Sequence, residues 1–142
     1  MTSTTWSGSS TGSTVRTSGR GVAMVAVGVD IVDVGRIRAA IERWGPRFLD
    51  RIYTPGEIAY CRGRARELES FAVRFAAKEA FAKALKVGKA SIWREVEIVR
   101  SEGPRPAILL HGGARELVGQ RRVDLSLSHA AAHAVAVVLI ED

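Results

Sequence analysis

The sequence predicts an α+β domain in which an N-terminal strand comes first, helices follow, and a small antiparallel sheet completes the chain. Three observations support this order. A Val/Ile-rich run occupies residues 22–34, strong helix formers fill residues 68–86, and apolar stretches of strand length follow Gly88. The 142 residues are enough for one domain with a sizeable core.

The first two elements follow from hydrophobic patterning. The run from Val22 to Val34 is typical of a buried strand. The next eleven residues, 34–44, carry an apolar stripe at helical spacing, and Gly45-Pro46 ends this helix.

Two short helices and one long helix are expected next. The first short helix covers residues 46–52. Thr54-Pro55-Gly56-Glu57 has the order of a capping box, with Pro at the first helical position, and starts a helix through Gly63. The long central helix is predicted over residues 68–86, with Gly88 as its stop.

The second half of the chain favours strands. Residues 92–99 and 106–111 are predicted as strands around the turn Ser101-Glu102-Gly103-Pro104. A short helix is expected over residues 114–119, and residues 125–140 hold the last strand.

The N-terminal segment differs in composition from the rest. Residues 1–22 are rich in Ser, Thr and Gly, so we expect a disordered tail before a domain at residues 23–142, with Met24 as a candidate biological start. No apolar run is long enough to span a bilayer, and the single Cys61 fits a reducing cytoplasm. The net charge of +6 favours polyanionic partners, but no block of like charges indicates a nucleic-acid-binding tail.

The central helix carries the most informative charges. Glu79 and Lys83 stand four residues apart and share one helical face, with Lys86 close to the same strip. Such a pair is most often an ordinary surface ion pair. Its flanks are apolar, however, and Asp30 lies upstream within the Val/Ile run, where it is either a strand-end residue capping the next helix or a metal ligand.

Two further residues suit phosphate binding. Arg74 stands directly before the helix motif, and its guanidinium offers a rigid fork of donors. His129, within Ser126-Leu127-Ser128-His129, is a better candidate for donation to a phosphate than for a Ser-His hydrolase, because no Gly-x-Ser-x-Gly elbow occurs. The sequence also lacks a Walker motif and a dinucleotide fingerprint, which disfavours ATP and NAD.

Three ordered blocks resemble holo-acyl-carrier-protein synthase, the small bacterial type of 4′-phosphopantetheinyl transferase. They are Gly28-Val29-Asp30-Ile31 with Arg36-Ile37, Arg74-Phe75-Ala76-Ala77-Lys78-Glu79-Ala80 with Lys83-Ala84, and Ser126-Leu127-Ser128-His129 before an apolar strand. The resemblance covers residues 25–141.

The resemblance implies a fold and a reaction. The family fold is α+β, and its members commonly form homotrimers with active sites between subunits. The enzyme moves 4′-phosphopantetheine from coenzyme A to a serine of an apo acyl carrier protein, releases adenosine 3′,5′-bisphosphate, and supports fatty acid biosynthesis. A carrier domain of a polyketide or peptide synthase is an alternative substrate, and a non-enzymatic module that grips an acidic protein or RNA is a different class of function.

Site residues are implied by the same resemblance. Asp30 and Glu79 would bind Mg²⁺, and Lys83 would contact the reacting phosphate. Arg74 and His129 would contact coenzyme A phosphates. The base for the carrier serine would be Glu79 or a water on the metal. The surface that meets the acidic carrier protein would consist of Arg36, Arg43 and Arg47.

Two departures from the family pattern stand out. Members often carry Gly-x-Gly after the long helix, whereas Lys86-Val87-Gly88 stands here. Some members carry an acid after the histidine, whereas Ala130, Ala131 and Ala132 follow His129. In the family, the Gly-x-Gly backbone is expected to contact the pyrophosphate of coenzyme A. Here the Lys86 side chain is a candidate to replace those contacts.

Overall fold

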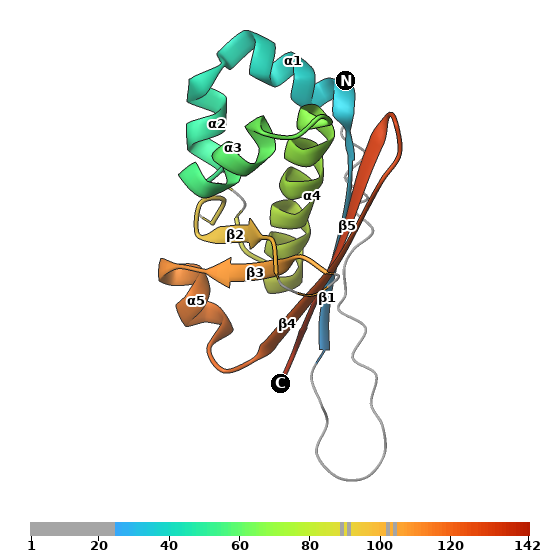
Figure 1. Cartoon of the computed structure of the whole chain (residues 1–142). Helices are drawn as coiled ribbons and strands as arrows, with labels where there is room; N and C mark the ends of the chain where they lie inside the picture. Colours follow the sequence, from blue (N-terminus) through green and yellow to red (C-terminus); the bar gives the residue numbers. More distant parts are fainter. Residues whose placement is uncertain (1–24, 89, 91, 102, 104) are drawn as a thin grey trace.

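The fold is α+β, with one long helix enclosed by a sheet on one side and shorter helices on the other (Figure 1). The computed structural model describes residues 25–142 except residues 89, 91, 102 and 104. The expected disorder of residues 1–22 and the candidate start at Met24 lie outside this part. Within it the elements in order are β1 Val25–Asp33, α1 Val34–Trp44, α2 Pro46–Ile52, α3 Pro55–Arg62, α4 Glu67–Leu85, β2 Val96–Val99, β3 Ala107–Leu110, α5 Gly112–Val118, β4 Arg122–His129 and β5 His133–Glu141.

Two antiparallel sheets flank the long helix α4. The larger sheet has the strand order β1-β5-β4, and β2 pairs with β3 in a separate ribbon. Helix α4 packs against β1 and β5, while α1 and α3 pack against its other sides. No helix in the described part of the chain is long and apolar enough to cross a lipid bilayer.

Two of the predicted helix starts, those of α1 and α3, have side-chain caps. Asp33 precedes α1, and its side chain accepts a hydrogen bond from the Gly35 amide at 2.8 Å. Thr54 and Glu57 form the expected capping box of α3, because each side chain accepts from the other residue's backbone amide. These caps satisfy amides that a helix start leaves unpaired.

Helix α4 begins and ends within one residue of the prediction, but the stop signal was wrong. Gly88 does not end it. Lys86 takes the left-handed conformation at the C-cap, with φ 57° and ψ 42°, and its amide bonds to Ala82 and Lys83 carbonyls. A left-handed position is normally filled by Gly, so a lysine here carries backbone strain.

The last predicted strand is in fact a hairpin. Residues 125–140 were expected to form one strand, whereas β4 and β5 pair antiparallel around a turn in which the Ala130 amide bonds to the His133 carbonyl at 2.9 Å. The three alanines at 130–132 provide no Gly, Pro or Asn turn signal, so the apolar pattern runs on without a visible break.

A buried ion pair ties α3, α4 and β2 together. Lys78 and Glu57 have fully buried side chains 2.6 Å apart. The ammonium also donates to the carbonyls of Trp93 and Val96, at 2.6 and 2.5 Å, and the Ile98 amide donates to Glu57 at 3.2 Å. Burial lowers the pKa of Lys78, against which the Glu57 carboxylate acts to raise it.

Strand β1 and helix α4 approach each other very closely at Gly28. A Cβ atom on Gly28 would lie 1.8 Å from the Ala80 carbonyl oxygen. The small side chains of α4 in this region, Ala76, Ala77, Ala80 and Ala84, are all buried. Glycine is therefore required at position 28, because any side chain there would clash with the α4 backbone and push β1 away from the helix.

We predict that Gly28→Ala lowers the free energy of unfolding by about 1–3 kcal/mol or more, the usual cost of overpacking a core. Chemical denaturation monitored by circular dichroism measures this change. Gly63→Ala is the matched control, because the nearest atom to its added Cβ is 3.7 Å away. Equal stability of the two variants would contradict the close approach of β1 and α4.

Candidate active site

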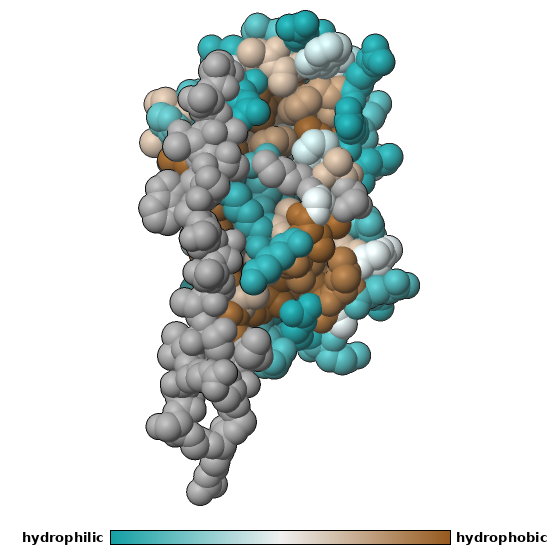
Figure 2. Space-filling view, turned by 180° about the vertical axis from the view of Figure 1, so that it is seen from behind, coloured by the Kyte–Doolittle hydropathy of each residue, from teal (hydrophilic) through white to brown (hydrophobic). Residues whose placement is uncertain are grey.

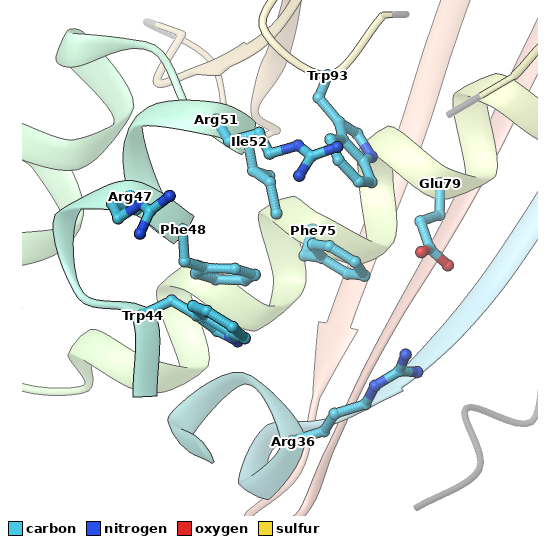
Figure 3. A pocket seen from close by; sticks show the side chains of 9 residues that line it. All are labelled: Arg36, Trp44, Arg47, Phe48, Arg51, Ile52, Phe75, Glu79 and Trp93. Carbon is cyan, nitrogen blue, oxygen red and sulfur yellow. The ribbon is translucent and has the colours of Figure 1, made fainter. Parts of the chain in front are cut away.

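A pocket of about 750 Å³ opens beside the middle of α4. We call it the Glu79 pocket (Figure 3). Its lining comes from α1, α2, α4 and the segment before β2, and consists of Arg36, Trp44, Arg47, Phe48, Arg51, Ile52, Phe75, Glu79 and Trp93. One carboxylate thus shares a cavity with three arginines and a mostly aromatic wall. Such a site favours an extended ligand that has both anionic and apolar parts.

Among the described residues that line the pocket, Glu79 provides the only carboxylate. Only 5% of the surface of Glu79 is exposed to solvent. Its side chain points from α4 into the pocket, towards Arg36 of α1 (Figure 3). A carboxylate is rarely buried to this extent without a compensating cation or hydrogen bonds. The site therefore holds a buried carboxyl group beside cationic side chains.

The aromatic wall is held by ring packing. Phe48 from α2 stacks with Phe75 from α4 at a centroid distance of 6.5 Å, and Phe75 contacts Trp93 at 6.2 Å. The guanidinium of Arg51 lies 5.9 Å from the Trp93 ring centroid. Sequence reasoning missed Arg51 and Trp93. The sequence did contain a signal for Arg51, because Arg47 and Arg51 stand four residues apart on α2 and so share one helical face. Trp93 lies outside any helix or strand, so periodicity gives no signal for it.

Asp30 and Lys83 are brought together across the interface of β1 and α4. The Lys83 ammonium lies 2.9 Å from Asp30 Oδ1 and 3.1 Å from the Val29 carbonyl oxygen. Asp30 is 3% exposed, and its Oδ2 atom is buried without a hydrogen-bond partner among the described residues. Lys83 follows Glu79 by one helical turn, so the same side of α4 carries both.

The Asp30 and Glu79 carboxylates do not form a larger acidic cluster. No group of three or more His, Cys, Asp or Glu side chains suited to a metal lies in the described part of the chain. Mg²⁺ does not need one, because it is usually bound by one or two carboxylates together with substrate phosphates and waters. The orphaned Oδ2 of Asp30 is the kind of atom that a cation satisfies.

Arg74 and His129 meet in a second pocket of about 210 Å³, which we call the Arg74 pocket. Its basic members also include Arg100 and Arg105, and Tyr60 and Ser70 contribute hydroxyls. Sequence reasoning placed Arg74 and His129 together and missed the other two arginines and Tyr60. These residues lie on separate elements, and only the fold gathers them.

Arg74 is pre-positioned in this pocket. It is 6% exposed, its guanidinium lies 4.3 Å from the Tyr60 ring centroid, and it donates to the Ser70 carbonyl at 3.3 Å. Its Nε atom is buried without a hydrogen-bond partner in the described residues. His129 Nδ1 lies 3.6 Å from Glu69 Oε2. The pocket thus concentrates positive charge and spare donors, as an anion site requires.

Comparison with known proteins decides the family. A model described as the 4′-phosphopantetheinyl transferase superfamily matches residues 26–138. The chain belongs to this superfamily. The family resemblance found in the sequence is therefore confirmed.

Individual relatives within the superfamily narrow the likeness. The chain is 47% identical over 124 residues to a holo-(acyl-carrier-protein) synthase of Koribacter versatilis. The aligned region covers 84% of this chain and 99% of that protein. It is similar to the crystal structure of the same enzyme from Neisseria meningitidis, with 34% identity, a TM-score of 0.74 and coverage of 84% and 100% of the two chains. The Helicobacter pylori enzyme in complex with coenzyme A has 33% identity, a TM-score of 0.69 and coverage of 80% and 98%. The predicted fold class is confirmed.

The two tyrosines of the chain are predicted to titrate separately. Tyr60 is partly buried, which would raise its pKa, but the hydrogen bond and charge of Arg64 with the charges of Arg100 and Arg74 lower it overall. Burial raises the pKa of Tyr53 well above its ordinary value, and its hydroxyl donates to the Phe71 carbonyl at 2.7 Å.

Absorbance titration of tyrosinate is therefore expected to show one group ionising below about pH 10, the ordinary tyrosine value, and the other ionising only with alkaline unfolding. Tyr60→Phe removes the first step and leaves the second. A single step of two groups at the ordinary pKa would refute the positive environment assigned to the Arg74 pocket.

Proposed function

We propose that this protein transfers the 4′-phosphopantetheine arm from coenzyme A to a serine of an apo acyl carrier protein and releases adenosine 3′,5′-bisphosphate, in the cytoplasm and in support of fatty acid biosynthesis. The observation that carries the proposal is the arrangement around α4 in a chain related to holo-(acyl-carrier-protein) synthases. Buried carboxylates, an ammonium and two arginine-lined pockets lie along one helix. Both proposed substrates are anionic.

Asp30 and Glu79 would hold Mg²⁺. Two observations support this assignment: the buried Oδ2 of Asp30 has no hydrogen-bond partner among the described residues, and Glu79 is buried. Bound there, the ion would supply Lewis-acid neutralisation of pyrophosphate charge. In the structure Lys83 is the cation that faces Asp30, so the site already balances one carboxylate before any metal enters.

Lys83, Arg74 and His129 would bind phosphate groups of coenzyme A. Phosphoryl transfer depends mainly on positioning and on stabilisation of developing charge. Lys83 has 22% of its side-chain surface exposed, so its ammonium can reach a phosphate while it remains near Asp30. It would neutralise the charge that develops on the leaving bisphosphate. Arg74 and His129 would orient the nucleotide phosphates from the Arg74 pocket.

The acidic carrier protein would dock on α1 and α2. Arg36 and Arg47 line the Glu79 pocket, and the Arg43 guanidinium lies 4.9 Å from the ring centroid of Trp44, which also lines it. These cations surround the cavity that contains Glu79, where the carrier serine must arrive. Glu79 would take the serine proton, since a carboxylate within the pocket can act as a general base.

A homotrimer would bury the outer face of β1. Four alternate residues of β1, namely Val25, Val27, Val29 and Ile31, are 38–50% exposed, and Val137 of β5 pairs with Val29. Figure 2 shows an apolar area on the face of the molecule seen from behind. Contiguous exposed apolar residues favour an interface, and further copies of the same chain would cover this face.

The central test mixes the protein with coenzyme A, Mg²⁺ and apo carrier protein. We expect the carrier mass to rise by one phosphopantetheine group, and Glu79→Gln to slow this transfer about a hundred-fold or more, as loss of a group that stabilises the transition state does. Mass spectrometry measures the transfer. Glu116→Gln, an exposed residue of α5, is the matched control.

Mg²⁺ should also raise the melting temperature of the wild type and not that of Asp30→Asn, because only the native metal site binds the ion. If the wild type left the carrier mass unchanged, the alternative function, a non-enzymatic module that binds an acidic protein or RNA, would be favoured. Transfer only to polyketide or peptide synthase carriers would redirect the substrate assignment.

Assembly is tested on the exposed face of β1. Val27→Glu should convert the trimer to a monomer, because a charge would be buried without a partner in the interface. Light scattering after size exclusion gives the mass, and circular dichroism confirms folding. Leu117→Glu is the control, since Leu117 is equally exposed, at 52%, but lies on α5. A wild-type monomer would overturn the trimer.

A further inference from the structure

Lys78 contacts neither pocket through its own side chain, yet it holds part of the wall of one. Its ammonium bonds to the Trp93 carbonyl at 2.6 Å and to the Val96 carbonyl at 2.5 Å. Both carbonyls belong to a tight turn over residues 92–96, in which the amides of Glu95 and Val96 bond to the Ile92 carbonyl. The turn therefore presents two acceptors to a single buried donor.

Glu57 holds the ammonium in place. Its Oε1 accepts from Lys78 at 2.6 Å and from the Thr54 amide at 3.0 Å, and its Oε2 accepts from the Ile98 amide at 3.2 Å. Thr54 in turn donates to Glu97, which contacts His111. Every charged atom of the ion pair thus has a backbone or side-chain partner, and α3, α4 and β2 are joined at one point.

The turn carries Trp93, the aromatic residue whose own carbonyl group Lys78 holds. The Trp93 ring lines the Glu79 pocket, packs on Phe75 and lies beside Arg51. In Figure 3 it stands across the upper part of the pocket, between Arg51 and Glu79. Its backbone is held by Lys78, the residue directly before Glu79. One helical turn therefore carries both the pocket carboxylate and the anchor of the opposing wall.

A buried ion pair is weak evidence for a stabilising role. Two apolar side chains of similar volume often stabilise a core as well as a buried pair does, because the pair must lose its hydration. What apolar side chains cannot supply is a donor that fixes two carbonyl groups. The useful property of Lys78 is thus geometric.

We propose that Lys78 is a positioning residue for the reaction: held by Glu57, it fixes the turn at Trp93 and thereby the shape of the Glu79 pocket. The inference rests on the proposed function, in which this pocket receives the carrier serine. Coenzyme A phosphates are assigned to Lys83, to the Arg74 pocket and to the ion that Asp30 and Glu79 would hold, whereas the Lys78 ammonium bonds to Glu57 and to the carbonyls of Trp93 and Val96. Loss of the anchor should therefore weaken use of the carrier protein and spare use of coenzyme A.

The decisive variant is Glu57→Gln/Lys78→Met. Lys78→Met alone leaves a buried unpaired carboxylate and is expected to fold poorly. The double variant is neutral, and Gln at position 57 can retain the capping box with Thr54. We expect its carrier-protein KM to rise about ten-fold or more, as is typical when a residue that orients a site is lost, with the coenzyme A KM unchanged.

Fluorescence supplies a readout that does not depend on activity. In a Trp6→Phe/Trp44→Phe background Trp93 is the sole tryptophan of the chain. The double variant should shift its emission to longer wavelength and increase its quenching by acrylamide. Val118→Ala, which creates a cavity in α5, is the control and is compared at a temperature where both variants are equally folded.

Wild-type kinetics or unchanged Trp93 emission in the double variant would overturn the proposal, as would equal rises in both KM values. An inactive wild type would instead refute the proposed function. The Trp93 emission would then still decide whether Lys78 fixes the turn.

Discussion

The fold depends on enclosing a helix that carries charge. Thirteen residues of α4 are buried, including Arg74, Lys78 and Glu79. Each of these charges needs a partner supplied by another element, because an unpaired ion in a core is very costly. Glu57 from α3 and two carbonyls near β2 serve Lys78, and Tyr60 serves Arg74. The surrounding elements are therefore fixed by the charges of α4 as well as by apolar packing.

Local signals in the sequence sufficed for the helices and failed where the partner was distant. The capping box at Thr54 and the length of α4 follow from residues close in sequence. The turn between β4 and β5 is stabilised by strand pairing and lacks turn-forming residues, so patterning merged the two strands. Lys86 ends α4 in a left-handed conformation that residues with a side chain disfavour. Residue propensities therefore placed the end of the helix at the nearest glycine, Gly88.

The same division applies to the candidate site. The family motif selected Asp30, Glu79, Lys83, Arg74 and His129, and the structure joins Asp30 to Lys83 and Arg74 to His129. The motif alone could not reveal that Lys83 pairs with Asp30, 53 positions earlier in the sequence. A pairing over that distance is determined by how β1 packs on α4. Gly28 is what makes the pairing geometrically available, because it lets the two backbones touch.

Strand β1 links the chemistry to the proposed assembly through its alternation. Asp30 and Gly28 face α4, while Val29 and Ile31 face outwards on the same strand. A strand cannot shift by one residue without exchanging these faces, which would bury valine against α4 and expose Asp30. The Asp30–Lys83 pair and the apolar outer surface are thus set by a single register. In the proposed assembly, a subunit that docked on this surface would also constrain the strand that carries Asp30, so the assembly and the geometry of the site would be coupled through one backbone.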